Sequence, residues 1–169
     1  MGDEARIGIK GLSYGGLNVL QAIARDSDLF AAGAANAPVF NWLSVMSGPL
    51  LGGPTSTETG GQYLFAGGTP TGYGFRQLQV GVEGSLEGPG RAAAVEAHTQ
   101  AAWDASPSGH FEGATSPLLF VHGDGDEDVF FQESVGAVRR LRRLGIEPEV
   151  KIFPDELHGL AARASTPHT

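Results

Sequence analysis

The stretch Arg6–Gly16, with the sequence RIGIKGLSYGG, decides the fold. Its first part, Arg6–Lys10, is short and β-branched, and a glycine follows it, so it predicts a β-strand. From Tyr14 to Arg25 the apolar residues recur at helical spacing, which predicts an α-helix. A strand that gives way to a helix within four residues is typical of α/β proteins.

Strands and helices alternate along the rest of the chain. Pro117–Val121 (PLLFV) is wholly apolar, as expected of a strand that is buried on both faces. Strands that are separated by helices pair in parallel through right-handed crossovers. The sequence therefore predicts an α/β fold, with a mostly parallel sheet of about four strands flanked by helices. The further predicted elements are the strands Ala31–Ala35 and Glu149–Phe153 and the helices Arg91–Trp103 and Gln132–Leu144.

Length and composition limit the class of protein. The 169 residues suit one domain, and 41% hydrophobic residues are enough for a core. The formal charge of −8 repels phosphate backbones and anionic lipid, so we expect no nucleic-acid and no membrane partner. The chain has no cysteine, which excludes disulfides and a cysteine nucleophile. Because Met1–Lys10 has no apolar run of signal-peptide length, we expect a cytoplasmic protein.

Glycine is concentrated in one part of the chain. Thirteen of the 26 glycines fall between Gly48 and Gly90, together with only four charged residues. This composition does not suit a core, although the segment contains aromatic residues that could pack on a neighbour. We interpret the segment 48–90 as an insertion or lid within a single domain that spans 1–169.

The segment Gly11–Gly16 (GLSYGG) contains a G-x-S-x-G pattern between a predicted strand and a predicted helix. This is the setting of a nucleophile elbow, a sharp turn that holds a serine in a strained conformation. The positions two before and two after the serine must lack side chains, which Gly11 and Gly15 provide. The helix that begins beside Ser13 would direct its positive end at an oxyanion, with the Tyr14 N–H as the first donor. The alternative is a glycine-rich turn with an incidental serine.

A serine hydroxyl becomes nucleophilic only when a base takes its proton, and an acid and a histidine follow in suitable places. After the strand PLLFV comes His122–Asp128 (HGDGDED), which puts several acids at the carboxyl end of a parallel strand. After the last strand comes Asp155–Gly159 (DELHG). The order serine, acid, histidine is that of α/β-hydrolases. The sequence therefore indicates a serine hydrolase that uses no cofactor.

These segments resemble the catalytic domain of the prolyl oligopeptidase family of serine peptidases, which includes dipeptidyl peptidases and acylaminoacyl peptidases. The resemblance covers Arg6–Trp42 and Ser116–Leu160 and rests on GLSYGG, NAPVFNW, PLLFVHGDGDEDV and IFPDELHG. It implies a partial α/β-hydrolase fold and a serine-type peptidase that hydrolyses peptide substrates through an acyl-enzyme. The roles it implies are Ser13 as nucleophile, Asp126 as orienting acid, His158 as general base and the Tyr14 amide as an oxyanion donor.

The same resemblance implies residues that bind the substrate. Trp42 resembles a wall of the pocket for the residue that precedes the scissile bond. Asp128 stands where the family often has an asparagine that holds a substrate carbonyl. The aromatic residues that dipeptidyl peptidases have shortly after the tryptophan are absent, because Leu43–Met46 follows here. Post-proline specificity is therefore not expected.

In the family, four strands precede the elbow, whereas Ser13 stands almost at the start of this sequence. The strand Arg6–Lys10 would then have an open edge, and we expect a companion segment or a second copy of the chain to cover it. Two alternatives to an active peptidase stay open at this point. The chain could be a catalytically impaired fragment of such a peptidase, or an esterase for small esters.

The acidic run Asp124–Asp128 also invites comparison with a calcium-binding loop. The later loop positions carry Val129 and Val135 where glycine and glutamate are needed, so no metal site is expected. The acids around Asp126 are instead interpreted as solvated loop residues.

The predicted helix Gln132–Leu144 is amphipathic. Its arginines, between Arg139 and Arg143, are interpreted as a solvated face and not as a nucleic-acid stripe. His122 is interpreted as a loop-shaping residue, and Trp103 and Phe111 as packing residues. The apolar stripe of the helix is predicted to be Val135, Val138, Leu141 and Leu144.

Overall fold

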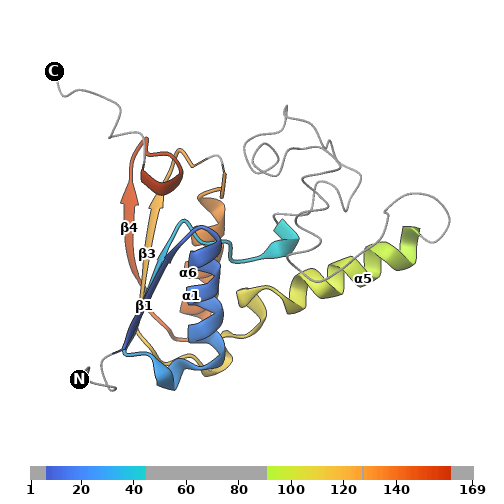
Figure 1. Cartoon of the computed structure of the whole chain (residues 1–169), viewed down its shortest axis with the longest axis horizontal. Helices are drawn as coiled ribbons and strands as arrows, with labels where there is room; N and C mark the ends of the chain where they lie inside the picture. The colour runs from blue at the N-terminus through green and yellow to red at the C-terminus, as the bar shows by residue number, and fades with distance from the viewer. Residues whose placement is uncertain (1–6, 45–90, 127, 161–169) are drawn as a thin grey trace.

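The computed structural model describes residues 7–44, 91–126 and 128–160 of the chain. Within these residues, four parallel strands form one sheet in the order β1-β2-β3-β4 (Figure 1). The strands are β1 (Gly8–Leu12), β2 (Ala32–Asn36), β3 (Leu118–Gly123) and β4 (Glu149–Phe153). The α-helices are α1 (Tyr14–Arg25), α5 (Arg91–Asp104) and α6 (Gln132–Arg143), and short 3-10 turns stand at Ser27–Leu29, Pro107–Gly109, Phe111–Gly113 and His158–Leu160.

The predicted α/β fold with a parallel sheet of four strands is confirmed. α1 and β4 have the predicted bounds, and most other ends shift by one residue. Both ends of β1 shift by two residues, so the strand begins at Gly8 and continues to Leu12, directly before the elbow. β1 extends this far because Leu12 still pairs with Asn36 of β2, and such backbone pairing leaves no mark in the side-chain pattern.

The core lies between the sheet and two helices. α1 and α6 lie side by side on one face of the sheet, whereas α5 extends away from it (Figure 1). Gly33 of β2 allows α1 to lie close to the sheet, because a Cβ there would come within 3.0 Å of the side chains of Ile23 and Leu118. The buried residues that form this core include Val19, Leu20 and Ile23 of α1, Ala137, Val138 and Leu141 of α6, and Ala35, Leu118 and Phe120 of the sheet.

The buried face of α6 differs from the predicted stripe. Two of the four predicted members, Val135 and Leu144, are only half-buried. The face includes two polar residues instead, Glu133 and Ser134, which are 5% and 2% exposed. A search for apolar periodicity cannot find such residues, and both have roles in the site described below.

The predicted solvated face of α6 is confirmed. Arg142 is exposed and pairs with Glu147, with Nε 2.9 Å from Oε1. Arg140 pairs with Glu112 of the preceding segment. Phe111 is fully buried as predicted, whereas Trp103 is 42% exposed.

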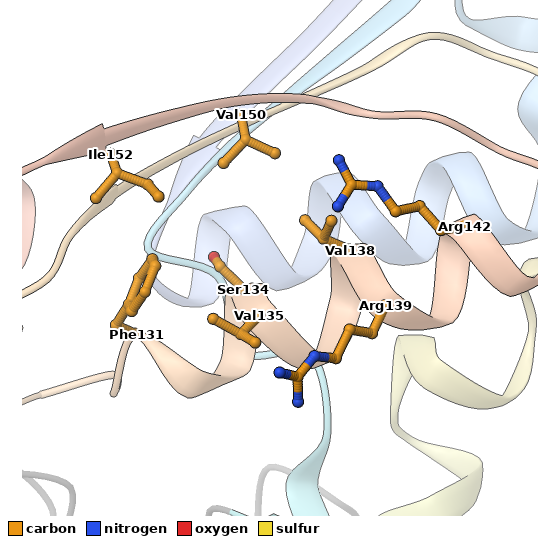
Figure 2. Close-up of a pocket in the computed structure, with 8 residues that line it drawn as sticks. All are labelled: Phe131, Ser134, Val135, Val138, Arg139, Arg142, Val150 and Ile152. Atoms are coloured by element: carbon orange, nitrogen blue, oxygen red, sulfur yellow. The ribbon is translucent and has the colours of Figure 1, made fainter.

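A hollow of about 290 Å³ lies between α6 and β4 (Figure 2). Its wall is mostly apolar, and two arginines of α6 border it. The lining residues are Phe131, Ser134, Val135, Val138, Arg139, Arg142, Val150 and Ile152.

Two further expectations concern the segment 48–90 and the absence of a membrane partner. The insertion or lid predicted at 48–90 lies outside the described residues. Over the ranges that are described, none of the helices combines the length and the apolar character needed to cross a membrane.

Candidate active site

All four strands end at the same edge of the sheet, because they are parallel. Strained turns collect at this edge. Ser13 follows β1, Ala37 follows β2 and Asp155 follows β4, with φ angles of 58°, 41° and 59°. Positive φ in a residue other than glycine is costly and is retained mainly at functional sites. The predicted site residues lie along this edge.

Ser13 forms the turn between β1 and α1, with φ 58° and ψ −120°. Its N–H donates to the Asn36 carbonyl over 2.9 Å, and its own carbonyl accepts from the Leu17 N–H over 3.0 Å. The turn is therefore fixed from both sides. Tyr14 is the first residue of α1, so its N–H has no acceptor within the helix. These features are those that a nucleophile elbow requires.

The glycines around Ser13 differ in how tightly they are packed. A Cβ at Gly11 would lie 2.2 Å from the Gly15 carbonyl oxygen, and one at Gly16 would lie 2.9 Å from the Asn36 carbonyl oxygen. A Cβ at Gly15, by contrast, would meet no atom within 4 Å. The expectation that Gly15 must lack a side chain is therefore wrong, because the close approach is between Gly11 and the backbone of the first helical turn.

Asp126 and His158 form a hydrogen-bonded pair across the ends of β3 and β4. His158 Nδ1 donates to Asp126 Oδ2 over 2.8 Å, and Asp126 Oδ1 accepts from the N–H groups of Asp128 and Val129 over 2.9 Å each. The Asp126 side chain is fully buried, and the His158 side chain is 18% exposed. Because Nδ1 carries the proton in this arrangement, Nε2 of the neutral ring is free to act as a base.

A second histidine supports the same carboxylate. His122 is 1% exposed, and its Nε2 lies 2.9 Å from the Val129 carbonyl oxygen and 3.2 Å from Asp126 Oδ2. A carbonyl only accepts, so Nε2 carries the proton and Nδ1 accepts the hydroxyl of Ser134 over 2.7 Å. The interpretation of His122 as a loop-shaping residue therefore missed its contact with the predicted catalytic acid.

Electrostatics favour an ionised Asp126 beside a basic His158. Burial acts to raise the pKa of Asp126, but the hydrogen bonds from His122, His158 and the Val129 amide outweigh it and hold the pKa well below its ordinary value. The hydrogen bond to Asp126 raises the pKa of His158 above its ordinary 6.5, although burial opposes this. The negative charges of Asp126 and Asp128 raise it further.

The turn that carries His158 is packed tightly against β3. A Cβ at Gly123 would lie 2.1 Å from the Glu156 carbonyl oxygen, which also accepts the Gly125 N–H over 3.1 Å. Asp124 is exposed, as predicted for a solvated acid, and its Oδ1 accepts the Asp155 N–H over 2.7 Å. A Cβ at Gly159 would lie 3.6 Å from Leu12, the residue before Ser13. The histidine turn therefore packs against the strand end that carries the predicted nucleophile.

Two aromatic residues stand beside Ser13. The rings of Tyr14 and Trp42 are 6.2 Å apart and inclined at 50°. Tyr14 is 42% exposed, whereas Trp42 is 3% exposed and packs with Leu17 and Val129. Of the two rings, that of Tyr14 is therefore the accessible one, and the ring of Trp42 is buried against it.

Among the side chains that the structure describes, no group of three His, Cys, Asp or Glu residues could hold a metal ion. The hollow between α6 and β4 is a separate feature, because Ser13, Asp126 and His158 do not line it (Figure 2).

The parallel sheet and the strand–serine–helix turn define an α/β-hydrolase fold. The model of the prolyl oligopeptidase family matches residues 1–63 and 90–169. The chain therefore belongs to the prolyl oligopeptidase family.

Individual proteins agree with this assignment. The chain is 28% identical to human dipeptidyl peptidase 8 over 98% of its length, and 28% identical to acylamino-acid-releasing enzyme 2 of Oryza sativa subsp. japonica over 92%. A solved acylaminoacyl peptidase in complex with Z-Gly-Gly-Phe-chloromethyl ketone has a TM-score of 0.66 and 26% identity over 96% of this chain. The uncomplexed acylaminoacyl peptidase of Pyrococcus horikoshii has the same TM-score, identity and coverage.

The chain spans only part of each of these proteins. It covers 15% of the dipeptidyl peptidase, 17% of the rice enzyme, and 21% and 22% of the two solved chains.

Because a Cβ would collide with backbone at Gly11 but not at Gly15, we expect alanine to have opposite effects at these two positions. Gly11→Ala should lower the free energy of unfolding by about 1–3 kcal/mol or more, because its Cβ collides with backbone that cannot move aside. Gly15→Ala should leave stability unchanged or raise it by up to about 1 kcal/mol, because alanine favours the helix over glycine. Urea unfolding of both variants measures this. A Gly15→Ala variant that is less stable than Gly11→Ala would contradict the packing described here.

The contact of His122 with Asp126 predicts that two amide substitutions differ. The side-chain N–H of His122→Gln can reach the place of Nε2, whereas that of His122→Asn lies near Nδ1. We expect kcat/KM for a small acyl ester to be lower in His122→Asn than in His122→Gln by about tenfold or more. The reason is that hydrogen bonds to charged groups contribute about 1.5–3 kcal/mol. Equal losses in both variants would show that the N–H facing Asp126 is unimportant.

Proposed function

We propose that this chain supplies the catalytic centre of a serine peptidase, with Ser13 as nucleophile, His158 as general base and Asp126 as orienting acid. The observation that carries the proposal is the 2.8 Å bond from His158 Nδ1 to the buried Asp126 carboxylate, at the sheet edge where Ser13 occupies a strained turn. Membership of a peptidase family supports the reaction class.

The reaction then proceeds through an acyl-enzyme. His158 Nε2 takes the proton of the Ser13 hydroxyl as Oγ attacks the substrate carbonyl carbon. The resulting oxyanion accepts the Tyr14 N–H, which the positive end of α1 favours. His158 passes its proton to the leaving nitrogen, and the C–N bond breaks. Water, activated by the same histidine, releases the acid and restores Ser13.

The role of Asp126 is to fix the ring of His158. Its carboxylate accepts from Nδ1, which keeps the basic lone pair on Nε2 and stabilises the imidazolium that forms during attack. The low pKa of Asp126 means that the carboxylate stays ionised when the base is active. The His122 N–H and the two backbone amides hold this carboxylate in one orientation.

The substrate class follows from the groups beside Ser13. The exposed ring of Tyr14, with the buried ring of Trp42 packed against it, would offer an aromatic surface to the residue that precedes the scissile bond. A related acylaminoacyl peptidase was solved with a phenylalanine chloromethyl ketone, which supports an apolar or aromatic residue at this position. Asp128, whose charge acts on His158, is proposed to contact the substrate. An ionised carboxylate only accepts, so it suits a substrate N–H and not a carbonyl.

We also propose a partner for the outer edge of β1. β1 is the first strand of the sheet among the described residues, and Ile7 and Leu12 are 48% and 45% exposed. A strand edge with exposed apolar side chains favours pairing with another strand. A companion segment or a second copy of the chain would supply this strand.

Covalent labelling with a fluorophosphonate tests the assignment of the nucleophile. Attack by Ser13 Oγ on phosphorus would expel fluoride and leave one adduct. We expect mass spectrometry of the labelled peptide to place the adduct on Ser13, and we expect Ser13→Ala to remain unlabelled. Labelling that persists in Ser13→Ala, or an unlabelled wild-type chain, would refute the assignment. Comparison of a peptide anilide with the matching ester then separates a peptidase from an esterase.

The raised pKa of His158 predicts how activity depends on pH. A base must be neutral, so kcat/KM should fall as pH drops through the pKa of His158, at a pH above the ordinary value of 6.5. Asp128→Asn removes a negative charge that raises this pKa and should move the acid limb to lower pH. The measurement is the pH profile of kcat/KM for a small ester. A limb that stays in place or moves to higher pH would contradict the electrostatic role of Asp128.

A further inference from the structure

Glu133 is a buried carboxylate that the proposed reaction does not use. It lies in the first turn of α6 and is 5% exposed. Its Oε2 accepts the backbone N–H groups of Phe40 over 2.9 Å and of Asn41 over 2.8 Å. Its Oε1 accepts the hydroxyl of Ser44. One side chain therefore binds three donors of a segment that lies about ninety residues away in the sequence.

The segment Phe40–Ser44 is the one that carries Trp42. The Trp42 N–H donates to Ser106 Oγ over 2.8 Å, and Asn41 Oδ1 accepts the Leu43 N–H over 2.9 Å. Together with Glu133, these bonds fix the backbone on both sides of Trp42. The Trp42 ring in turn lies against Tyr14, which follows Ser13 directly.

The residue that follows Glu133 is linked to the proposed triad through His122. The next residue, Ser134, donates to His122, and His122 contacts Asp126. The first turn of α6 is thus connected to the Trp42 segment through Glu133. It is connected to Asp126 through Ser134 and His122. Loss of the Glu133 carboxylate would destabilise the Trp42 segment, because the backbone N–H groups of Phe40 and Asn41 would then lack their acceptor.

We propose that Glu133 is a positioning residue that holds the Trp42 segment in place and thereby sets the preference for an aromatic side chain before the scissile bond. This inference rests on the function proposed above and deepens it.

The hydrogen bonds define which part of Glu133 is required. Oε2 must accept two N–H groups, whereas Oε1 faces a hydroxyl that can either donate or accept. Burial raises the pKa of Glu133, opposed by the bonds from Ser44, Asn41 and Phe40 and by the nearby His122. A neutral amide therefore suits the place: in Glu133→Gln the carbonyl oxygen would accept the two amides and the NH₂ would donate to Ser44.

The test compares two substrates and three variants of the full chain. The substrates are the p-nitrophenyl esters of N-acetylphenylalanine and N-acetylglycine, which differ only in the side chain before the scissile bond. We expect Glu133→Ala to lower the ratio of their kcat/KM values, phenylalanine over glycine, by about tenfold. Glu133→Gln should restore the ratio to within about threefold of the wild-type value.

Ser116→Ala is the matched control for a general loss of stability. Ser116 is buried and donates to the Ser27 carbonyl at the opposite end of the sheet, before β3. Its substitution should leave the ratio of the two esters unchanged. A ratio that is unchanged in Glu133→Ala, or lowered equally in Ser116→Ala, would overturn the inference. Equal loss in Glu133→Gln and Glu133→Ala would overturn it as well.

Fluorescence separates a failure of this inference from a failure of the proposed function. The chain has two tryptophans, and in a Trp103→Phe background the buried Trp42 is the only tryptophan left to emit. Acrylamide should quench Trp42 more strongly in Glu133→Ala and as weakly as in the wild type in Glu133→Gln. If Ser13 is not labelled and neither ester is hydrolysed, the proposed function fails, while this quenching still decides whether Glu133 holds the Trp42 segment. Equal quenching in all variants would refute that role.

Discussion

The buried carboxylate of Asp126 accepts hydrogen bonds from two histidine rings and two backbone amides, and the arrangement of the site follows from these bonds. Burying a charge is costly unless it is fully paired, and here the bonds more than offset burial, because the pKa of Asp126 is lowered and not raised. The same carboxylate raises the pKa of His158 and determines which of its nitrogens is the base.

Close approach of backbone segments brings the site residues together. Gly11 allows the first turn of α1 to fold back onto β1, and Gly123 allows the turn before His158 to lie against β3. Both contacts would be lost with any side chain at these positions. α6 adds a second kind of constraint, because its first turn is polar and buried and connects through Glu133 and Ser134 to two different parts of the site. The site therefore depends on contacts that are distant in the sequence.

Much of this could be predicted from the sequence, and the rest could not for identifiable reasons. The α/β sheet and the positions of Ser13, Asp126 and His158 after the ends of β1, β3 and β4 follow from alternating elements and short motifs. Glu133 was missed because a lone glutamate in an amphipathic helix normally faces water, and its partners are backbone N–H groups that carry no sequence signal. The motif pattern treats Gly11 and Gly15 alike, whereas only the folded backbone shows that Gly11 is the crowded one.

The most direct test of the account is the separation of Ser13 Oγ and His158 Nε2 in a crystal structure of the chain. The account predicts that the two atoms lie within hydrogen-bond distance, about 2.6–3.2 Å, or are bridged by one water, while Nδ1 stays bonded to Asp126. A His158 ring that is turned away from Ser13, with its bond to Asp126 broken, would contradict it.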